Sequence, residues 1–190
     1  MLKDLIRACR SYRRFLQEPI SREVLLELID GARLSASAAN LQPLRYVVVL
    51  DPGVREQVFS CLRWAAYLQD WPGPAEGERP TAYVIVLGDC RISKDFKIDA
   101  GIAIQNLLLL AVERGLGGCI IGSIDRHTLR EILGIEGHYE IIVTVALGRP
   151  AERVVIEELG PAQDIRYWRD EAGVHHVPKR RLEDLIIKVI

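Results

Sequence analysis

The sequence of 190 residues has no paired-cysteine motif. Cysteines that lie far apart and form no CxxC pair give no indication of an iron–sulfur cluster or a zinc knuckle. Isolated cysteines are usually small buried apolar residues in a reducing compartment, so we expect a cytoplasmic protein. The four cysteines are Cys9, Cys61, Cys90 and Cys119.

An excess of charge of either sign is also missing. The chain has 25 lysines and arginines against 26 aspartates and glutamates, a net charge of −1. A general nucleic-acid-binding protein needs a basic surface for its phosphate contacts, so we expect no nucleic-acid partner. The length suits one domain with a sizeable core, and we predict a single domain over residues 1–190.

No apolar run is long enough to cross a bilayer. The most apolar stretch, AIQNLLLLAV, is interrupted by Gln105 and Asn106. Asp4 falls where a secretory signal peptide needs an uninterrupted apolar core. We therefore expect neither a membrane-spanning helix nor a signal peptide.

Histidines are few and are not grouped as metal ligands. His175 and His176 are adjacent, so on a strand their side chains would point to opposite faces. His127 and His138 stand alone in the sequence. Because a metal site needs three or four converging ligands, we predict no metal site.

Hydrophobic periodicity predicts helices that alternate with buried strands. Apolar spacing indicates helices at residues 2–9, 22–32, 54–62, 98–114 and 126–133, with Ser21 and Asp125 as N-caps and Gly134 past the last end. The helix at 98–114 is apolar nearly all round and is expected to be central. Continuous β-branched runs indicate buried strands at residues 45–50, 81–89 and 141–148, and residues 165–177 can form an edge hairpin.

A basic cluster, CRSYRRF, covers residues 9–15. Arginine presents a planar fork of donors that matches phosphate, and a serine hydroxyl adds another donor. A second basic cluster, KRR, covers residues 179–181 at the other end of the chain, so both can face one phosphate if the ends meet. The alternative for the first cluster is a solvated helix end, where cations suit the helix dipole.

The usual nucleotide-binding motifs are absent. No Walker sequence occurs, and GLGGCI has Ile120 where the GxGxxG pattern needs its last glycine. A dinucleotide-binding fold of that kind is therefore not expected.

Four segments together resemble the successive motifs of the nitroreductase family of FMN-dependent oxidoreductases. They are RSYRRF, SASAANLQPLRYVVV, DAGIAIQNLLLLAVERGLGGCIIGS and HVPKRRLED, in the family's order and spread over nearly the whole chain. The resemblance implies an α+β, nitroreductase-like three-layer fold with a central, mainly antiparallel sheet flanked by helices. It also implies an intertwined homodimer with FMN at the interface.

The resemblance assigns cofactor-binding residues position by position. Arg10, Ser11 and Arg13 correspond to the family's clamp on the FMN phosphate and ribityl chain, and Lys179 and Arg181 would complete it. Many relatives have a further arginine where this chain has Cys9, and a tryptophan where it has Leu44. Two more groups are implied: Ser37, Asn40 and Gln42 reach the flavin of the other subunit, and Ile121, Gly122 and Ser123 lie against the ring edge.

Three aromatic residues precede a loop rich in proline and glycine. Trp64, Tyr67 and Trp71 are spaced by three and four residues, which predicts one helical face. They can form a packed aromatic stripe. By the resemblance they can instead be a lid over the open face of the flavin, against which a flat substrate stacks.

The resemblance implies an oxidoreductase that passes electrons from NADH or NADPH through FMN to nitroaromatic, quinone or similar electron-poor acceptors. The flavin carries the chemistry, so no catalytic side chain is predicted. We expect Asp99 and Gln105 on the long helix to be cap, dimer-contact or core-satisfying groups. The alternatives are a specialised flavin enzyme for reductive dehalogenation or flavin cleavage, and a non-catalytic flavin-binding protein.

Overall fold

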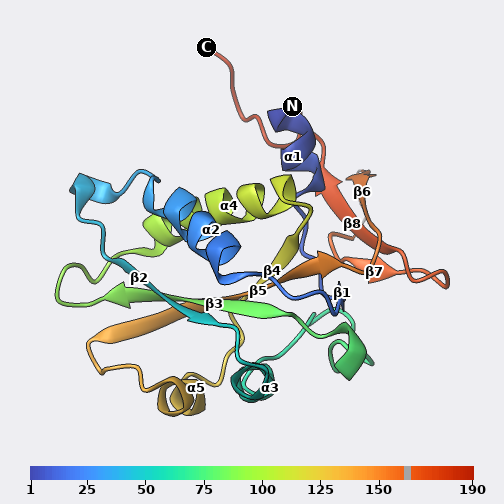
Figure 1. Cartoon of the computed structure of the whole chain (residues 1–190). Helices are drawn as coiled ribbons and strands as arrows, with labels where there is room; N and C mark the ends of the chain where they lie inside the picture. Colours follow the sequence, from blue (N-terminus) through green and yellow to red (C-terminus); the bar gives the residue numbers. More distant parts are fainter. Residues whose placement is uncertain (161–163) are drawn as a thin grey trace.

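A sheet of five antiparallel strands forms the middle layer of this computed structural model, which describes residues 1–160 and 164–190 (Figure 1). The strand order is β1-β5-β3-β2, and β4 also pairs with β5. The antiparallel pairing agrees with the predicted fold class. The strands span Phe15–Leu16 (β1), Leu44–Val49 (β2), Ala82–Asp89 (β3), Gly117–Ile121 (β4) and Tyr139–Pro150 (β5).

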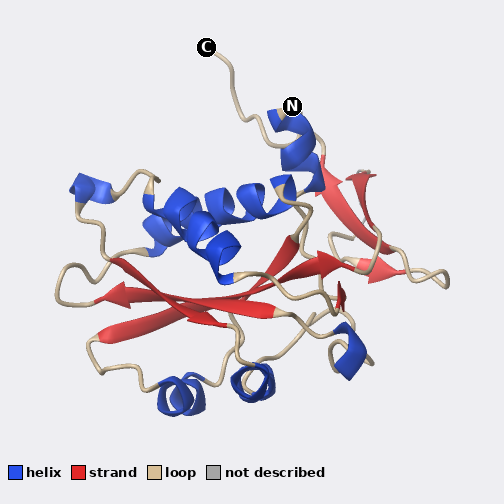
Figure 2. Ribbon diagram, in the orientation of Figure 1, coloured by secondary structure: helices blue, strands red, loops and turns tan. Residues whose placement is uncertain are grey.

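Helices cover both faces of this sheet (Figure 2). α2 and α4 lie on one face and α3 and α5 on the other, which confirms the predicted three layers. Alternate residues of β3 separate two cores, because Val84 and Val86 pack towards α2 and α4 while Tyr83 and Ile85 pack towards α3 and α5. The helices span Leu2–Ala8 (α1), Arg22–Arg33 (α2), Pro52–Ser60 (α3), Lys97–Glu113 (α4) and Arg126–Leu133 (α5), with short 3-10 turns at Ala38–Asn40 and Glu76–Glu78.

Capping residues set the ends of these helices as predicted. Ser21 Oγ accepts a hydrogen bond from Val24 N–H at 3.3 Å, and Asp125 Oδ1 accepts one from Thr128 N–H at 3.1 Å. Each contact satisfies a backbone donor that a helix leaves unpaired at its start. Gly134 ends α5 with a φ of 61°, a left-handed conformation that glycine adopts without strain.

The C-terminal part of the chain forms a second sheet of three strands. β8 is its middle strand, parallel to β6 and antiparallel to β7, with Trp168 opposite His176. The hairpin predicted within residues 165–177 is confirmed, and it belongs to this second sheet. The strands span Val154–Leu159 (β6), Trp168–Arg169 (β7) and His175–Arg180 (β8).

The prediction that Trp64, Tyr67 and Trp71 share a helical face is wrong. α3 ends at Ser60, and the segment that follows forms turns. Leu62 forms an antiparallel bridge to Ile124. Arg63 N–H donates to Ser123 O in the glycine-rich segment at 3.0 Å. This pairing with a distant part of the chain uses backbone groups that a continued helix would need.

Residues 1–160 and 164–190 contain neither a helix suited to a membrane nor a cluster of metal ligands. None of the helices there combines the length and the hydropathy needed to cross a bilayer. No group of three or more histidine, cysteine, aspartate or glutamate side chains in these ranges is arranged to hold a metal ion.

Candidate functional site

A cavity of about 290 Å³ lies where the segment after α1 meets β8. Arg10, Ser11 and Arg13 line it from the N-terminal side, and Lys179 lines it from the second sheet. Among the described residues, no aspartate or glutamate lines this cavity. The two basic clusters at opposite ends of the sequence therefore contribute three cations to one cavity that has no lining anion.

The free edge of β4 holds the N-terminal arm, by which we mean residues 9–14. Ser11 forms a parallel bridge to Gly118, and Tyr12 N–H donates to Gly118 O at 3.0 Å. Tyr12 also donates its hydroxyl to Ala8 O at 3.0 Å. Main-chain pairing to the sheet thus sets where the arginines of the arm can point.

Arg13 is the most buried cation of the cavity, with 7% of its surface exposed. Its Nη1 donates to Ser11 O at 3.3 Å and to His175 Nε2 at 3.0 Å. Its guanidinium lies 4.7 Å from the ring centroid of Tyr167, within the range of a cation–π contact. The buried Nε of Arg13 has no hydrogen-bond partner in the described part of the chain, so one donor is left for a ligand.

Arg10 and Lys179 complete the cationic lining. Arg10 donates from Nη2 to Ile6 O at 2.8 Å, and its buried Nε has no partner among residues 1–160 and 164–190. Lys179 lies on β8. On the α4 side of the cavity, Gln105 donates to Cys9 Sγ at 3.6 Å, and Cys9 is a buried packing residue.

His175 lines the cavity from β8 and is fully buried. Burial lowers its pKa to about 4, and the positive charges of Arg13 and Arg169 act in the same direction. The imidazole is therefore neutral at pH 7. Because a guanidinium can only donate, Nε2 must be the acceptor and Nδ1 carries the proton.

His175 and Tyr167 line the cavity, although neither was predicted from the sequence as part of a site. The signal available was alternation along the predicted hairpin, which puts one histidine of the HH pair inside and the other outside. His175 is the inner one. His176 lies between two carboxylates, with Nδ1 at 2.5 Å from Glu157 Oε1 and Nε2 at 3.2 Å from Asp170 Oδ2.

Two other arginines of the basic clusters point away from the cavity. Arg181 follows the end of β8 and forms ion pairs with Glu183 at 3.2 Å and Asp184 at 3.3 Å. Arg14 forms an ion pair with Glu78 at 3.2 Å. Of the five residues predicted for the phosphate clamp, the structure brings four together and leaves Arg181 outside.

The glycine-rich segment passes from the cavity to an exposed edge. Ile121 is buried, with 4% of its surface exposed, whereas Gly122 and Ser123 are exposed. A Cβ added at Gly122 would meet no atom within 4 Å. Ile120 is 46% exposed, so β4 offers an open surface continuous with the cavity that Gly118 and Ile120 line.

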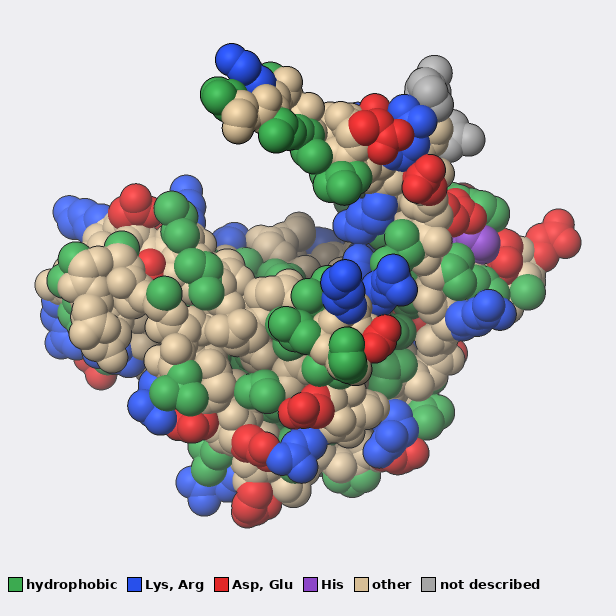
Figure 3. All heavy atoms as spheres, turned by 90° about the horizontal axis from the view of Figure 1, so that it is seen from above, with side chains coloured by type: hydrophobic (Ala, Val, Ile, Leu, Met, Phe, Trp, Pro, Cys, Tyr) green, Lys and Arg blue, Asp and Glu red, His purple; other side chains and the backbone are tan. Residues whose placement is uncertain are grey.

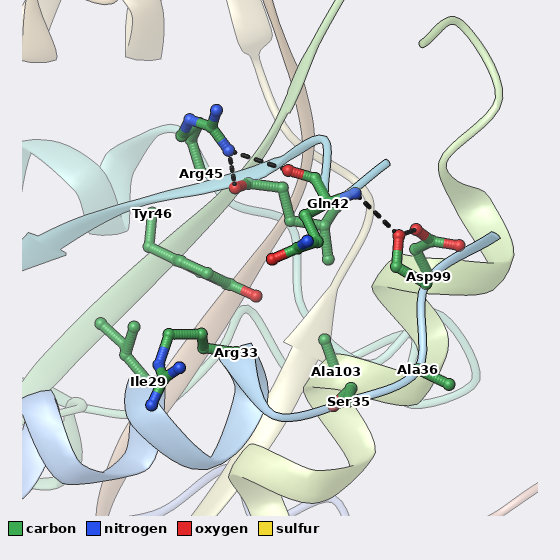
Figure 4. Close-up of a pocket in the computed structure, with 11 residues that line it drawn as sticks. Ile29, Arg33, Ser35, Ala36, Gln42, Arg45, Tyr46, Asp99 and Ala103 are labelled. Carbon is green, nitrogen blue, oxygen red and sulfur yellow. Dashed lines mark hydrogen bonds between the residues drawn. The ribbon is translucent and has the colours of Figure 1, made fainter. Parts of the chain in front are cut away.

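Ser37 and Gln42 line a different cavity, of about 330 Å³, between α2, β2 and α4 (Figure 4). Ser37 Oγ donates to Asp99 Oδ2 at 2.5 Å and accepts from Gln42 N–H at 2.9 Å. Gln42 Nε2 donates to Asn40 Oδ1 at 3.1 Å. Asp99 is 4% exposed, so this buried carboxylate holds the loop against the start of α4.

The backbone of this loop is strained. Ala39, Asn40 and Gln42 have φ values of 48°, 54° and 50°, in the left-handed region that costs non-glycine residues about 1–2 kcal/mol each. Strain of this kind persists only where surrounding contacts hold it, and it often marks functional sites. The contacts of Asp99 and Ser37 fill that role here.

The aromatic residues after α3 do not line either cavity. Trp64 is 8% exposed and belongs to the core beneath the sheet, in contact with Phe59. The ring of Tyr67 lies against that of Tyr167 in a tilted arrangement with centroids 5.0 Å apart, and the ring centroid of Trp71 lies 4.7 Å from the guanidinium of Arg169. Trp64 therefore packs in the core, and a lid role for these residues stays a prediction.

The model of the Nitroreductase family matches residues 6–149 of this chain. The chain belongs to the nitroreductase family. Tyr167, His175 and Lys179 lie beyond the matched residues, so one wall of the cavity is built by the part of this chain that the family model does not cover.

Similar proteins and a similar solved structure are consistent with this family. A protein named NADH dehydrogenase from Thermus thermophilus is 29% identical over 188 residues, with 84% of this chain and 92% of that protein covered. The NADPH-flavin oxidoreductase of Vibrio harveyi is 26% identical, with 84% and 70% covered. A solved structure from Desulfovibrio desulfuricans, described as a nitroreductase in complex with FMN, has a TM-score of 0.73 at 22% identity and covers 100% of this chain and 96% of that one. The last comparison shows the nitroreductase fold.

Proposed function

We propose that this chain binds FMN, with the phosphate in the cavity between the N-terminal arm and β8. The observation that carries the proposal is the charge of that cavity, because Arg10, Arg13 and Lys179 line it and no carboxylate of the described residues does. The partnerless Nε donors of Arg10 and Arg13, together with the hydroxyl of Ser11, suit a phosphate dianion. Each charge-assisted hydrogen bond to it contributes about 1.5–3 kcal/mol.

The isoalloxazine ring would lie along the exposed end of β4. A flat ring can approach a backbone only where side chains are small, and the open space around Gly122 supports this placement. Ile121 and Ser123 would then face the ring edge through backbone groups. The role suggested for Arg181 has no support from its position, since its guanidinium is paired with Glu183 and Asp184.

We propose a homodimer with FMN at the interface and one domain in each chain. Ser37 and Gln42 lie in a separate cavity from the phosphate residues of the same chain, which fits a loop that serves the partner's flavin together with Asn40. The outer face of α4 carries exposed apolar residues, with Ile98 73% and Ile102 40% exposed. The C-terminal segment 185–190, apolar except for Lys188, is also exposed, and it projects from the body of the molecule (Figure 3).

The reaction we propose is electron transfer from NADH or NADPH to nitroaromatics, quinones or similar electron-poor acceptors. FMN bound in this way would supply the redox chemistry that links the nicotinamide to the acceptor. The residues of the chain hold the phosphate, support the ring and limit the access of water. The name of the NADPH-flavin oxidoreductase of Vibrio harveyi supports this class of reaction.

The test begins with the purified protein. Flavin released by denaturation is identified as FMN by chromatography, and its visible absorbance in the protein is followed by stopped flow after anaerobic mixing with NADH or NADPH. Bleaching by either nicotinamide, followed by reoxidation with a nitroaromatic or a quinone, is the expected result. A protein that takes up no FMN, alone or on reconstitution, refutes the proposal.

Other outcomes distinguish the alternatives. Bound FMN that neither nicotinamide bleaches indicates a non-catalytic flavin-binding protein. Intact FMN that disappears during turnover indicates flavin cleavage. Release of halide from a halogenated aromatic, without turnover of nitroaromatics or quinones, indicates a reductive dehalogenase.

A further inference from the structure

We propose that Glu152 is a positioning residue of the phosphate cavity, an inference that rests on the proposed binding of FMN there. Glu152 lies in the short connection between β5 and β6, where the main sheet passes into the second sheet. Its side chain is only 1% exposed. A carboxylate is rarely buried so completely unless it is paired, and the pairs of Glu152 lead directly to the cavity.

One oxygen of Glu152 holds the backbone of the N-terminal arm. Oε1 accepts hydrogen bonds from the N–H groups of Arg13 and Arg14, the second at 3.1 Å. The neighbouring residue Ala151 donates its N–H to Arg14 O at 2.9 Å. These contacts fix the peptide groups on both sides of Arg13, and so the direction in which its guanidinium enters the cavity.

The other oxygen holds the second sheet. Oε2 accepts from Arg169 Nη2 on β7 at 2.9 Å. The next residue, Arg153, accepts from His175 N–H through its carbonyl at 2.8 Å, and His175 begins the strand that carries Lys179. The connection at residues 151–153 therefore ties the arm and β8 together, and these are the two walls that supply the cations.

The charge of Glu152 also balances a cluster of arginines behind the cavity. Burial lowers the pKa of Arg169, the carboxylate of Glu152 opposes this change, and the charges of Arg14 and Arg13 reinforce it. Glu152 does not line the cavity itself. It can thus compensate the arginines without placing a negative oxygen where the phosphate of FMN would sit.

The role is that of a positioning residue because Glu152 acts on a phosphate ligand only through the arm and the second sheet. A defect in positioning should weaken FMN more than riboflavin, which has the same ring and ribityl chain but no phosphate. A general loss of structure should weaken both ligands together. The ratio of the dissociation constants of riboflavin and FMN therefore separates the two explanations.

The experiment measures both dissociation constants by flavin fluorescence on the full-length FMN-free protein. Glu152→Ala removes the acceptor and the charge, and we expect the ratio to fall about tenfold, the factor that corresponds to one ordinary hydrogen bond. Glu152→Gln keeps one oxygen for the two N–H groups but loses the charge and presents an amide to Arg169. Its ratio should fall about threefold, between wild type and Glu152→Ala.

Glu157→Gln is the matched control. Glu157 also lies in the second sheet, and its Oε1 pairs with Nδ1 of His176 at 2.5 Å, but it does not contact the arm. Its ratio should stay within about twofold of wild type. Circular dichroism of each FMN-free variant checks folding, and if Glu152→Ala does not fold, the comparison of Glu152→Gln with Glu157→Gln decides.

A wild-type ratio in Glu152→Ala, or equal weakening of FMN and riboflavin in both Glu152 variants, overturns the inference. If the wild type itself binds no flavin, the proposed function fails. If the wild type binds FMN and riboflavin equally, the placement of the phosphate in this cavity fails.

Discussion

Mild acid should destabilise the FMN-free protein through His175. Between pH 7 and pH 5 this histidine stays neutral in the folded chain, because burial and the nearby Arg13 and Arg169 hold its pKa at about 4 against an ordinary value of 6.5. The unfolded chain takes up the proton more readily in this window. The free energy of unfolding therefore decreases as the pH falls from 6.5 towards 4, and it increases again as the pH rises through the same range.

The size of the effect follows from the shift. A difference of one pKa unit between the folded and unfolded chain corresponds to about 1.4 kcal/mol. Between pH 7 and pH 5, the lowered pKa of His175 reduces the free energy of unfolding by about 2 kcal/mol. Solvent in the adjoining cavity screens part of this, so we expect a loss of about 1–2 kcal/mol in the free energy of unfolding.

Urea unfolding of the wild type and of His175→Gln at pH 7, 6 and 5 measures the effect. Glutamine can accept from Arg13 but does not titrate, so the variant should lose about 1–2 kcal/mol less than the wild type over this range. His127→Gln is the control, since the side chain of His127 is 84% exposed, and it should follow the wild type. If wild type and His175→Gln lose the same free energy, His175 is not a buried neutral base and the reasoning is refuted.

Three other predictions concern the cavity, the strained loop and the core. Arg13→Ala should weaken FMN binding about 10- to 100-fold and Arg14→Ala much less, measured by fluorescence titration, and equal losses would show that the wrong arginine is assigned. Asp99→Ala should speed hydrogen exchange of the Ala38 amide about tenfold or more, while Asp99→Asn should keep it protected. Unchanged exchange in both variants would show that Asp99 does not hold the strained loop. Leu107→Ala, at a fully buried position of α4, should lower the free energy of unfolding in urea by about 2–5 kcal/mol, and a loss below about 1 kcal/mol would contradict its core position.

The sequence determined the helices α1 to α5 and three strands of the main sheet, β2, β3 and β5, because local signals agree there with tertiary packing. The strands β1 and β4 were not predicted: β1 has two residues, and β4 lies in a glycine-rich segment. Ser21 and Asp125 begin helices where predicted, and Gly134 ends one, since each cap involves backbone groups within a few residues. The continuous apolar run of β3 is buried along its whole length because helices cover both faces. The order of the motifs was also sufficient for the family.

Only the tertiary structure decided how the site is assembled. Which arginine enters the cavity depends on the pairing of the arm with β4 and on Glu152, contacts that join residues more than a hundred positions apart. The position of Trp64 also depends on a long-range contact. Trp64 does not lie on the helical face predicted for it, because Leu62 pairs with Ile124. His175 and Glu152 belong to no motif, and their importance lies in burial and partners. Burial and long-range hydrogen bonding are properties of the folded chain, so a pattern of neighbouring residues determined which elements form but not which side chains meet.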